Sequence, residues 1–167
     1  METTTNFDTI ISKLRLTSEL KQAHICLEEF TNNYFSHENN ANIDAYCSKL
    51  PGDLPQLFKE LFMQRPSDSQ NQTTYKNKID ELVTKLYKCR IVELTLAFKP
   101  DNNTIAYFSD WIKKNVGSDV VIDLQFNPSI VGGAQIIYNG MYKDYSIRKK
   151  LAGTFQIHRD EITHLLK

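Results

Sequence analysis

The stretch that decides the fold of this chain is residues 127–151, which read Asn-Pro-Ser-Ile-Val-Gly-Gly-Ala-Gln-Ile-Ile-Tyr-Asn-Gly-Met-Tyr-Lys-Asp-Tyr-Ser-Ile-Arg-Lys-Lys-Leu. Pro128 fixes its own φ angle and favours an extended conformation at the residue before it. Gly132 and Gly133 permit backbone angles that a residue with a Cβ resists. The start of this stretch therefore predicts a tight turn.

A hairpin and a helix follow this turn in the sequence. Residues 134–138 read as a short strand, Asn139-Gly140 is the strongest short signal for a two-residue hairpin turn, and residues 141–143 read as the partner strand. A helix is expected next, capped by Asp144 or Ser146. Its first turns are basic, with Arg148, Lys149 and Lys150 ahead of the apolar Leu151.

Upstream of the turn, the pattern changes from helical to strand spacing near Cys89. Residues 90–96 alternate in polarity and contain β-branched side chains, which predicts a strand with one buried face. A helix over residues 103–115, capped by Asn102 or Asn103, and a strand over residues 120–126 come next.

The first half of the chain shows apolar residues at helical spacing. We predict helical structure at residues 7–35, 43–50, 54–65 and 75–88, with polar loops at 37–42 and 66–74 and a helix end before Pro66. Thr17 and Ser18 interrupt the first of these segments, and they either cap a second helix or lie on its solvated face. The expected class is α+β. A helical domain occupies residues 1–88, and a small α/β domain with a hairpin and a C-terminal helix occupies residues 89–167.

Composition excludes several classes of protein. The 167 residues contain 20 basic and 20 acidic side chains, and neither half of the chain is polybasic, which argues against nucleic acid as a partner. No apolar run reaches the roughly 18 residues of a membrane span. The first residues lack the basic start and apolar run of a secretory signal, so we expect a cytoplasmic protein.

The side chains that could act in catalysis or bind a metal do not form a known catalytic or metal-binding pattern. Cys26, Cys47 and Cys89 are far apart in sequence, which is typical of reduced, packed thiols. The Gly-Gly pair is not followed by the Lys-Ser/Thr of a phosphate-binding loop. We therefore expect no catalytic residue, metal ligand or cofactor, and purified protein is expected neither to bind nor to hydrolyse ATP.

One helix of the second half carries aromatic residues that could be read in two ways. Tyr107 and Trp111 lie one helical turn apart, and the neutral charge balance favours a place in the core over a platform for stacking nucleic-acid bases. Lys113 is expected on the solvated face of the same helix, where its replacement by alanine would change stability by less than about 0.5 kcal/mol.

The second half resembles the C-terminal domain of the delta subunit of F-type ATP synthases, whose mitochondrial counterpart is the oligomycin-sensitivity-conferring protein. That family usually shows Asp-Pro-Ser-Leu-Ile-Gly-Gly, a strand, a turn, a second strand, and then Asp-Gly-Ser with a basic helix. The order and spacing are the same here. Asn127 replaces the usual aspartate, and Tyr145 replaces the usual glycine.

The resemblance implies a non-catalytic stator subunit in the peripheral stalk. Its N-terminal helical domain would bind the alpha subunits of the catalytic head, and its C-terminal domain would bind b-type stalk subunits. The helical domain here is reduced relative to the family. The resemblance also implies a peripheral position on the cytoplasmic face of the cell membrane. The motif and stalk-interaction residues would be Pro128, Ser129, Gly132, Gly133, Asp144, Ser146 and Arg148.

Two other functions fit the sequence pattern. The chain could be a cytoplasmic adaptor with a helical interaction region. It could also be a small-ligand domain or enzyme with a site at the strand ends of the α/β unit. The missing catalytic pattern counts against the enzyme.

Overall fold

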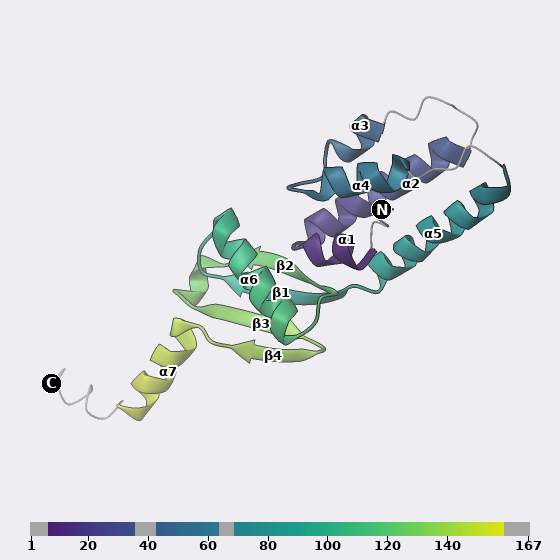
Figure 1. Ribbon diagram of the computed structural model, residues 1–167. Helices are drawn as coiled ribbons and strands as arrows, with labels where there is room; N and C mark the ends of the chain where they lie inside the picture. The colour runs from purple at the N-terminus through teal and green to yellow at the C-terminus, as the bar shows by residue number, and fades with distance from the viewer. Residues whose placement is uncertain (1–6, 36–42, 64–68, 159–167) are drawn as a thin grey trace.

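The structure, a computed structural model, describes residues 7–35, 43–63 and 69–158 (Figure 1). Helices of the first half pack together at one end of the molecule, and a four-stranded sheet with its own helices forms the other part. This arrangement confirms the predicted α+β class. The division into domains at residues 88 and 89 stays a prediction.

The helices of the first half enclose an apolar core. Phe30 and Phe62 stack with ring centroids 3.8 Å apart, and Phe58 meets Phe62 edge-on. All three rings are fully buried, and each such burial contributes about 1.5–3 kcal/mol. The helices are α1 (Phe7–Lys13), α2 (Thr17–Phe35), α3 (Ile43–Cys47), α4 (Leu54–Met63) and α5 (Ser69–Tyr87).

Of the two alternatives for Thr17 and Ser18, the structure has the second helix, because the apolar stripe over residues 7–35 is divided between α1 and α2. The second begins at Thr17 because Glu19 Oε2 accepts hydrogen bonds from the backbone nitrogens of Arg15 at 2.6 Å and Leu16 at 3.2 Å. A glutamate in the first turn that reaches back to the cap position is half of a capping box.

The predicted loop at residues 66–74 is wrong in its second part, because α5 already begins at Ser69. Its polar composition suggested a loop, but packing of the helix outweighs local propensity. The Tyr75 hydroxyl donates a hydrogen bond to the Leu61 carbonyl at 3.1 Å, which ties α5 to α4. The predicted loop at 37–42 and the helix end at Pro66 lie outside the described residues.

The sheet confirms the predicted strands. It contains β1 (Arg90–Leu96), β2 (Val120–Phe126), β3 (Ala134–Tyr138) and β4 (Met141–Asp144), in the order β2-β1-β3-β4. β1 and β2 are parallel, whereas β3 runs antiparallel to β1 and forms a hairpin with β4. Asn139 and Gly140 have φ angles of 50° and 73°, as the turn predicted for this hairpin requires.

Helix α6 (Asn102–Asn115) connects the parallel strands and lies over β1 and β2 (Figure 1). Its cap is Asp101, whose side chain accepts a hydrogen bond from the backbone nitrogen of Thr104, and not either of the two asparagines that the sequence suggested. Val120 and Ile122 of β2 pack in the core beneath α6, whereas Val121 between them packs in the helical core. β2 is therefore buried on both faces.

Two short elements frame the predicted turn. A 3₁₀ helix, η1 (Pro128–Ile130), follows β2, and α7 (Ile147–Ile157) follows β4 and extends away from the sheet (Figure 1). Within the described ranges, no helix is both long and apolar enough to cross a membrane.

Candidate partner-binding surface

The turn between β2 and β3 is built by side-chain caps and by glycines. Asn127 Oδ1 accepts a hydrogen bond from the Ser129 nitrogen at 3.0 Å, and Pro128 occupies the first turn of η1. Asparagine thus supplies here the acceptor oxygen that an aspartate carboxylate would supply. Asn127 therefore caps η1 without a carboxylate.

Gly132 and Gly133 bring this turn against the start of α7. The backbone nitrogen of Ile147 donates to the Gly132 carbonyl at 2.9 Å. Gly133 has a φ of +80°, and a Cβ there would lie 2.4 Å from the Tyr145 carbonyl oxygen and 3.2 Å from the Ser146 Cα. A Cβ on Gly132 would meet only the movable end of the Ile147 side chain, at 2.6 Å. Gly133 is therefore the stricter requirement.

Asp144 and Ser146 both stabilise the entry into α7, in different ways. Asp144 Oδ1 accepts from the Ser146 nitrogen at 2.8 Å, and Asp144 Oδ2 accepts from Gln135 and from the Tyr142 hydroxyl, each at 3.2 Å. The hydrogen bonds, that from Ser146 first, lower the pKa of Asp144 to about 2. Ser146 is the helix cap, because its Oγ accepts from the Lys149 nitrogen.

The structure brings four of the predicted site residues together and leaves the others apart. Gly132, Gly133, Asp144 and Ser146 meet where the turn contacts the start of α7. Pro128 and Ser129 lie in η1, and Arg148 is exposed on the first turn of α7. The motif therefore serves to position α7 relative to the sheet.

An apolar groove lies beside α6, on the face of the sheet that this helix only partly covers. Side chains of α6 pack against β1 and β2 in the core, and the groove continues from α6 along residues of β3 and β4. The groove has a volume of about 490 Å³. Among the described residues that line it, Lys143 carries the charge, and the others are aliphatic or aromatic: Val92, Leu94, Tyr107, Phe108, Trp111, Ile112, Val116, Ala134, Ile136, Tyr138, Met141 and Tyr145.

Tyr107 and Trp111 line this groove, which contradicts the prediction that they are core residues. Tyr107 is 68% exposed and Trp111 is 56% exposed. The side of α6 that packs in the core is the adjacent one, with Phe108 and Ile112. Two large aromatic side chains beside an open apolar groove are typical of protein-binding surfaces.

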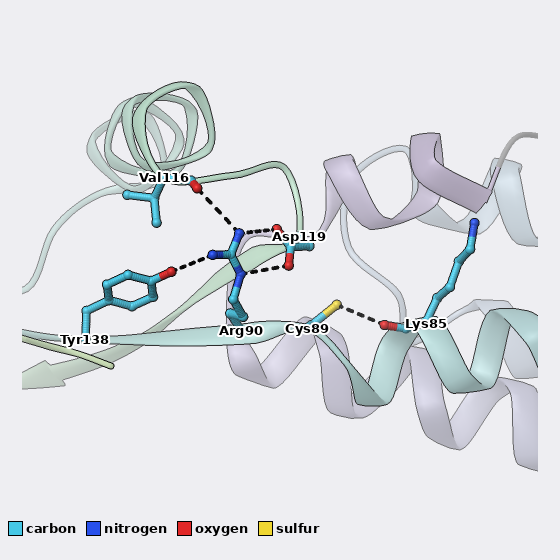
Figure 2. Close-up of polar contacts among 6 residues, drawn as sticks. All are labelled: Lys85, Cys89, Arg90, Val116, Asp119 and Tyr138. Carbon is cyan, nitrogen blue, oxygen red and sulfur yellow. Dashed lines mark hydrogen bonds and ion pairs between the residues drawn. The ribbon is translucent and has the colours of Figure 1, made fainter. Parts of the chain in front are cut away.

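Arg90 bonds to two residues that line the groove, Tyr138 and Val116 (Figure 2). Its guanidinium donates to both carboxylate oxygens of Asp119, at 2.6 and 2.8 Å, and to the Tyr138 hydroxyl at 2.7 Å. A further, longer bond reaches the carbonyl of Val116 at 3.4 Å. Arg90 lowers the pKa of Asp119, as expected for a bidentate ion pair. This cluster fixes the end of α6 to β1, to β3 and to the turn before β2, and no local sequence pattern indicates it.

A separate joint connects the sheet to the helical part. Leu16, between α1 and α2, forms a parallel bridge with Ile122 at the edge of β2, and the Ile122 nitrogen donates to the Arg15 carbonyl at 2.8 Å. Thr17 donates its hydroxyl hydrogen to Asp123 at 2.9 Å. The link between the first two helices thus acts as an extra edge of the sheet.

Lys113 strengthens this joint and is not the solvated residue that the sequence suggested. Its Nζ reaches from α6 to the carbonyls of Ser12 and Leu14 at the end of α1. Burial lowers the pKa of Lys113 to about 8, whereas the Glu19 carboxylate opposes that shift. The side chain therefore spans the two parts of the molecule.

Replacing Lys113 with methionine should lower the free energy of unfolding at pH 7 by about 1–2 kcal/mol, because two carbonyls lose their donor. The difference in the free energy of unfolding between the wild-type chain and this variant should grow with pH. Folded Lys113 releases its proton near pH 8, but an unfolded lysine does so near about pH 10.4, so the wild-type chain gains stability across this window. Urea unfolding at several pH values measures both effects.

The matched control for this prediction is Lys114, the exposed neighbour on the same helix. Its replacement by methionine should change stability by less than about 0.5 kcal/mol at every pH. Equal losses in the two variants, or a difference that shrinks as pH rises, would contradict the assigned role of Lys113.

Comparison with known protein families adds an independent finding to this geometry. A family model described as ATP synthase delta (OSCP) subunit matches residues 4–154. The match includes the helical part as well as the sheet, the turn and the start of α7. A comparison with curated protein sequences gives no match.

Proposed function

Because the chain belongs to the ATP synthase delta (OSCP) subunit family, a family of peripheral-stalk subunits, we propose that it joins the catalytic head to the b-type stalk. The observation that carries this proposal is the match over residues 4–154, which includes both parts of the fold. The alternative functions, an adaptor or a small-ligand domain, have no comparable support.

The apolar groove beside α6 is the surface that we assign to the b-type stalk. An amphipathic partner helix would place its apolar face in such a groove, with its polar face towards solvent. Trp111 and Tyr107 provide the large exposed rings that commonly dominate binding energy. Lys143 favours a partner that presents a carboxylate at the groove wall.

Helix α7 offers a second surface for the same partner. Ile147, Leu151 and Phe155 repeat at intervals of four residues along α7, and each is exposed. Asp144, Ser146 and the glycine turn fix the direction in which this helix leaves the sheet. A stalk helix that extends from the groove could therefore contact α7 as well.

The contact with the alpha subunits of the head belongs, in this proposal, to the helical part. Exposed apolar side chains are available there, among them Met63 at 72% and Tyr87 at 69% exposure. A stator has to transmit force between its two contacts, so its parts must not move freely. The bridge of Leu16 to Ile122 and the contacts of Lys113 meet that need.

The proposal is tested by asking whether one chain binds both partners at once. The full chain is mixed with the isolated catalytic head and with the soluble part of the b-type subunit, and the species are separated by size. We expect a ternary complex, with no association of head and stalk when the chain is omitted. Head and stalk that associate equally well without the chain would contradict the linking role.

A second expectation concerns catalysis. The purified chain should neither bind nor hydrolyse ATP, because the sequence lacks the phosphate-binding loop and the metal-binding carboxylates that such chemistry uses. Phosphate release and nucleotide binding are measured on the isolated chain. Turnover that survives further purification and is lost on a point substitution in this chain would contradict the non-catalytic role.

In the complex, we place the subunit peripherally on the cytoplasmic face of the membrane.

A further inference from the structure

Two buried cysteines lie next to each other in the helical part. Cys26 on α2 is 1% exposed, Cys47 at the end of α3 is fully buried, and their sulfur atoms are 3.9 Å apart. Cys89 lies elsewhere, with its thiol directed at the Lys85 carbonyl at 3.6 Å (Figure 2). The fold thus pairs two cysteines that are separated by 21 positions in the sequence.

This arrangement is close to the geometry of a disulfide. A disulfide needs a sulfur separation of about 2.05 Å, so the two atoms must approach by roughly 2 Å, which side-chain rotation with a small shift of a helix can supply. α3 is suited to such a shift because it is a helix of five residues. Its polar side is held by the exposed ion pair of Asp44 with Lys59 at 2.6 Å.

The two thiols differ in their readiness to ionise. The two thiols share a hydrogen bond in which either can donate. This bond lowers the pKa of Cys47, and nearby Lys59 acts in the same direction against burial and Asp44. The pKa of Cys26 is raised, by the contact with Cys47 and by burial. Because Lys59 lies near Cys47 and Glu29 lies near Cys26, we assign the first attack to the Cys47 thiolate. The Cys26 sulfur, 3.9 Å away, is placed to complete the disulfide.

We propose that Cys26 and Cys47 are a modification site, a dithiol that hydrogen peroxide converts reversibly into a disulfide linking α2 to α3. In the first step the Cys47 thiolate attacks one peroxide oxygen, the O–O bond breaks, and hydroxide leaves, which gives Cys47 sulfenic acid. In the second step the Cys26 sulfur attacks the Cys47 sulfur, the S–O bond breaks, and the Cys26 proton leaves with the oxygen as water. Two thiols lose two electrons, and peroxide is reduced to two molecules of water.

The disulfide would stabilise the helical part. It closes the chain between residues 26 and 47, which restricts the unfolded state more than the folded state. A thiol pair elsewhere in the molecule would not have this effect on α3. The inference does not depend on the stator function, because it concerns chemistry within the chain.

The test uses the full chain in which Cys89 is replaced by serine, so that the core thiols stay unchanged. Protein is treated with hydrogen peroxide, quenched, denatured and alkylated, and intact mass is measured. We expect both thiols to be protected from alkylation, a single linked peptide pair, recovery of both thiols with dithiothreitol, and a melting temperature several degrees above that of the reduced form. Two alkylated thiols under conditions that fully oxidise free cysteine would overturn the proposal.

Single variants test the assigned order of the steps. In Cys26→Ala the sulfenic acid on Cys47 cannot be resolved and should be trapped by dimedone. In Cys47→Ala, dimedone should leave Cys26 unlabelled and peroxide should leave the melting temperature unchanged. Circular dichroism first establishes that each variant folds. Peroxide that links Cys89 to either partner in the wild-type chain, in place of the pair, would also overturn the proposal.

Discussion

Replacing Gly133 with valine is expected to lower the free energy of unfolding by about 2–5 kcal/mol. A β-branched residue at a φ of +80° costs about 1–2 kcal/mol through backbone strain alone. The new Cβ would also lie 2.4 Å from the Tyr145 carbonyl oxygen, an atom of the backbone that cannot rotate away. Relief of that clash by a backbone shift adds about 1–3 kcal/mol. Urea unfolding with a constant m-value measures the loss.

Gly140 provides the control for this variant. It has a similar φ of +73°, but a Cβ there meets nothing within 4 Å. Gly140→Val should therefore show the cost of backbone strain without the clash, a loss of about 1–2 kcal/mol. The difference between the variants isolates the close approach of the turn to the start of α7. If the two variants lost equal unfolding free energy, the close contact of Gly133 with the Tyr145 backbone would not constrain the fold.

Gly133→Val is also expected to reduce binding to the stalk. The clash separates the turn from Tyr145 and Ser146, so α7 and the adjoining groove wall lose their alignment. Binding is measured at a temperature where the variant is still folded. Gly140→Val leaves the start of α7 in place, so this variant should still bind the stalk.

Replacing Trp111 with alanine should weaken binding of a stalk helix by roughly thirtyfold or more, the effect of losing about 2 kcal/mol from a central aromatic contact. Trp111 is 56% exposed, so much of its surface is free to be buried by a partner. For the same reason the free energy of unfolding should fall by less than about 1 kcal/mol. Titration calorimetry and urea unfolding separate the two effects.

Tyr87 is the matched control, because it is another exposed aromatic residue, 69% exposed, on α5 of the helical part. Tyr87→Ala should leave stalk binding within about threefold of the wild-type value. A loss of binding shared by both variants would indicate a general effect on folding. Unchanged binding in Trp111→Ala would remove the groove from the proposed interface.

The local pattern of the sequence predicted the sheet well. β3 has the predicted bounds Ala134–Tyr138, because alternation ends at an Asn-Gly pair that only a tight hairpin turn explains. The same holds for β1 and β2, whose period differs from that of the preceding helices. The start of α7 was predicted with two possible caps, and the structure uses Ser146 as the cap and Asp144 to hold the turn before it.

Contacts between distant residues could not be predicted in this way. Arg90 meets Asp119 and Tyr138 because the strand order places them together, and no local spacing encodes that order. Lys113 looks like a solvated helix residue until the end of α1 is placed beside it. Trp111 and Ile112 are apolar neighbours in the sequence, and only the packing of α6 on the sheet decides that Ile112 is buried and Trp111 is exposed.

The most direct test of the stator assignment is titration calorimetry of the wild-type chain with a peptide from the C-terminal end of the cognate b-type subunit. The account predicts saturable binding with a negative heat-capacity change, as expected when apolar surface is buried, and a large loss of affinity in Trp111→Ala. Folded wild-type chain that shows no binding to this peptide at any accessible concentration would contradict the assignment of the groove to the stalk.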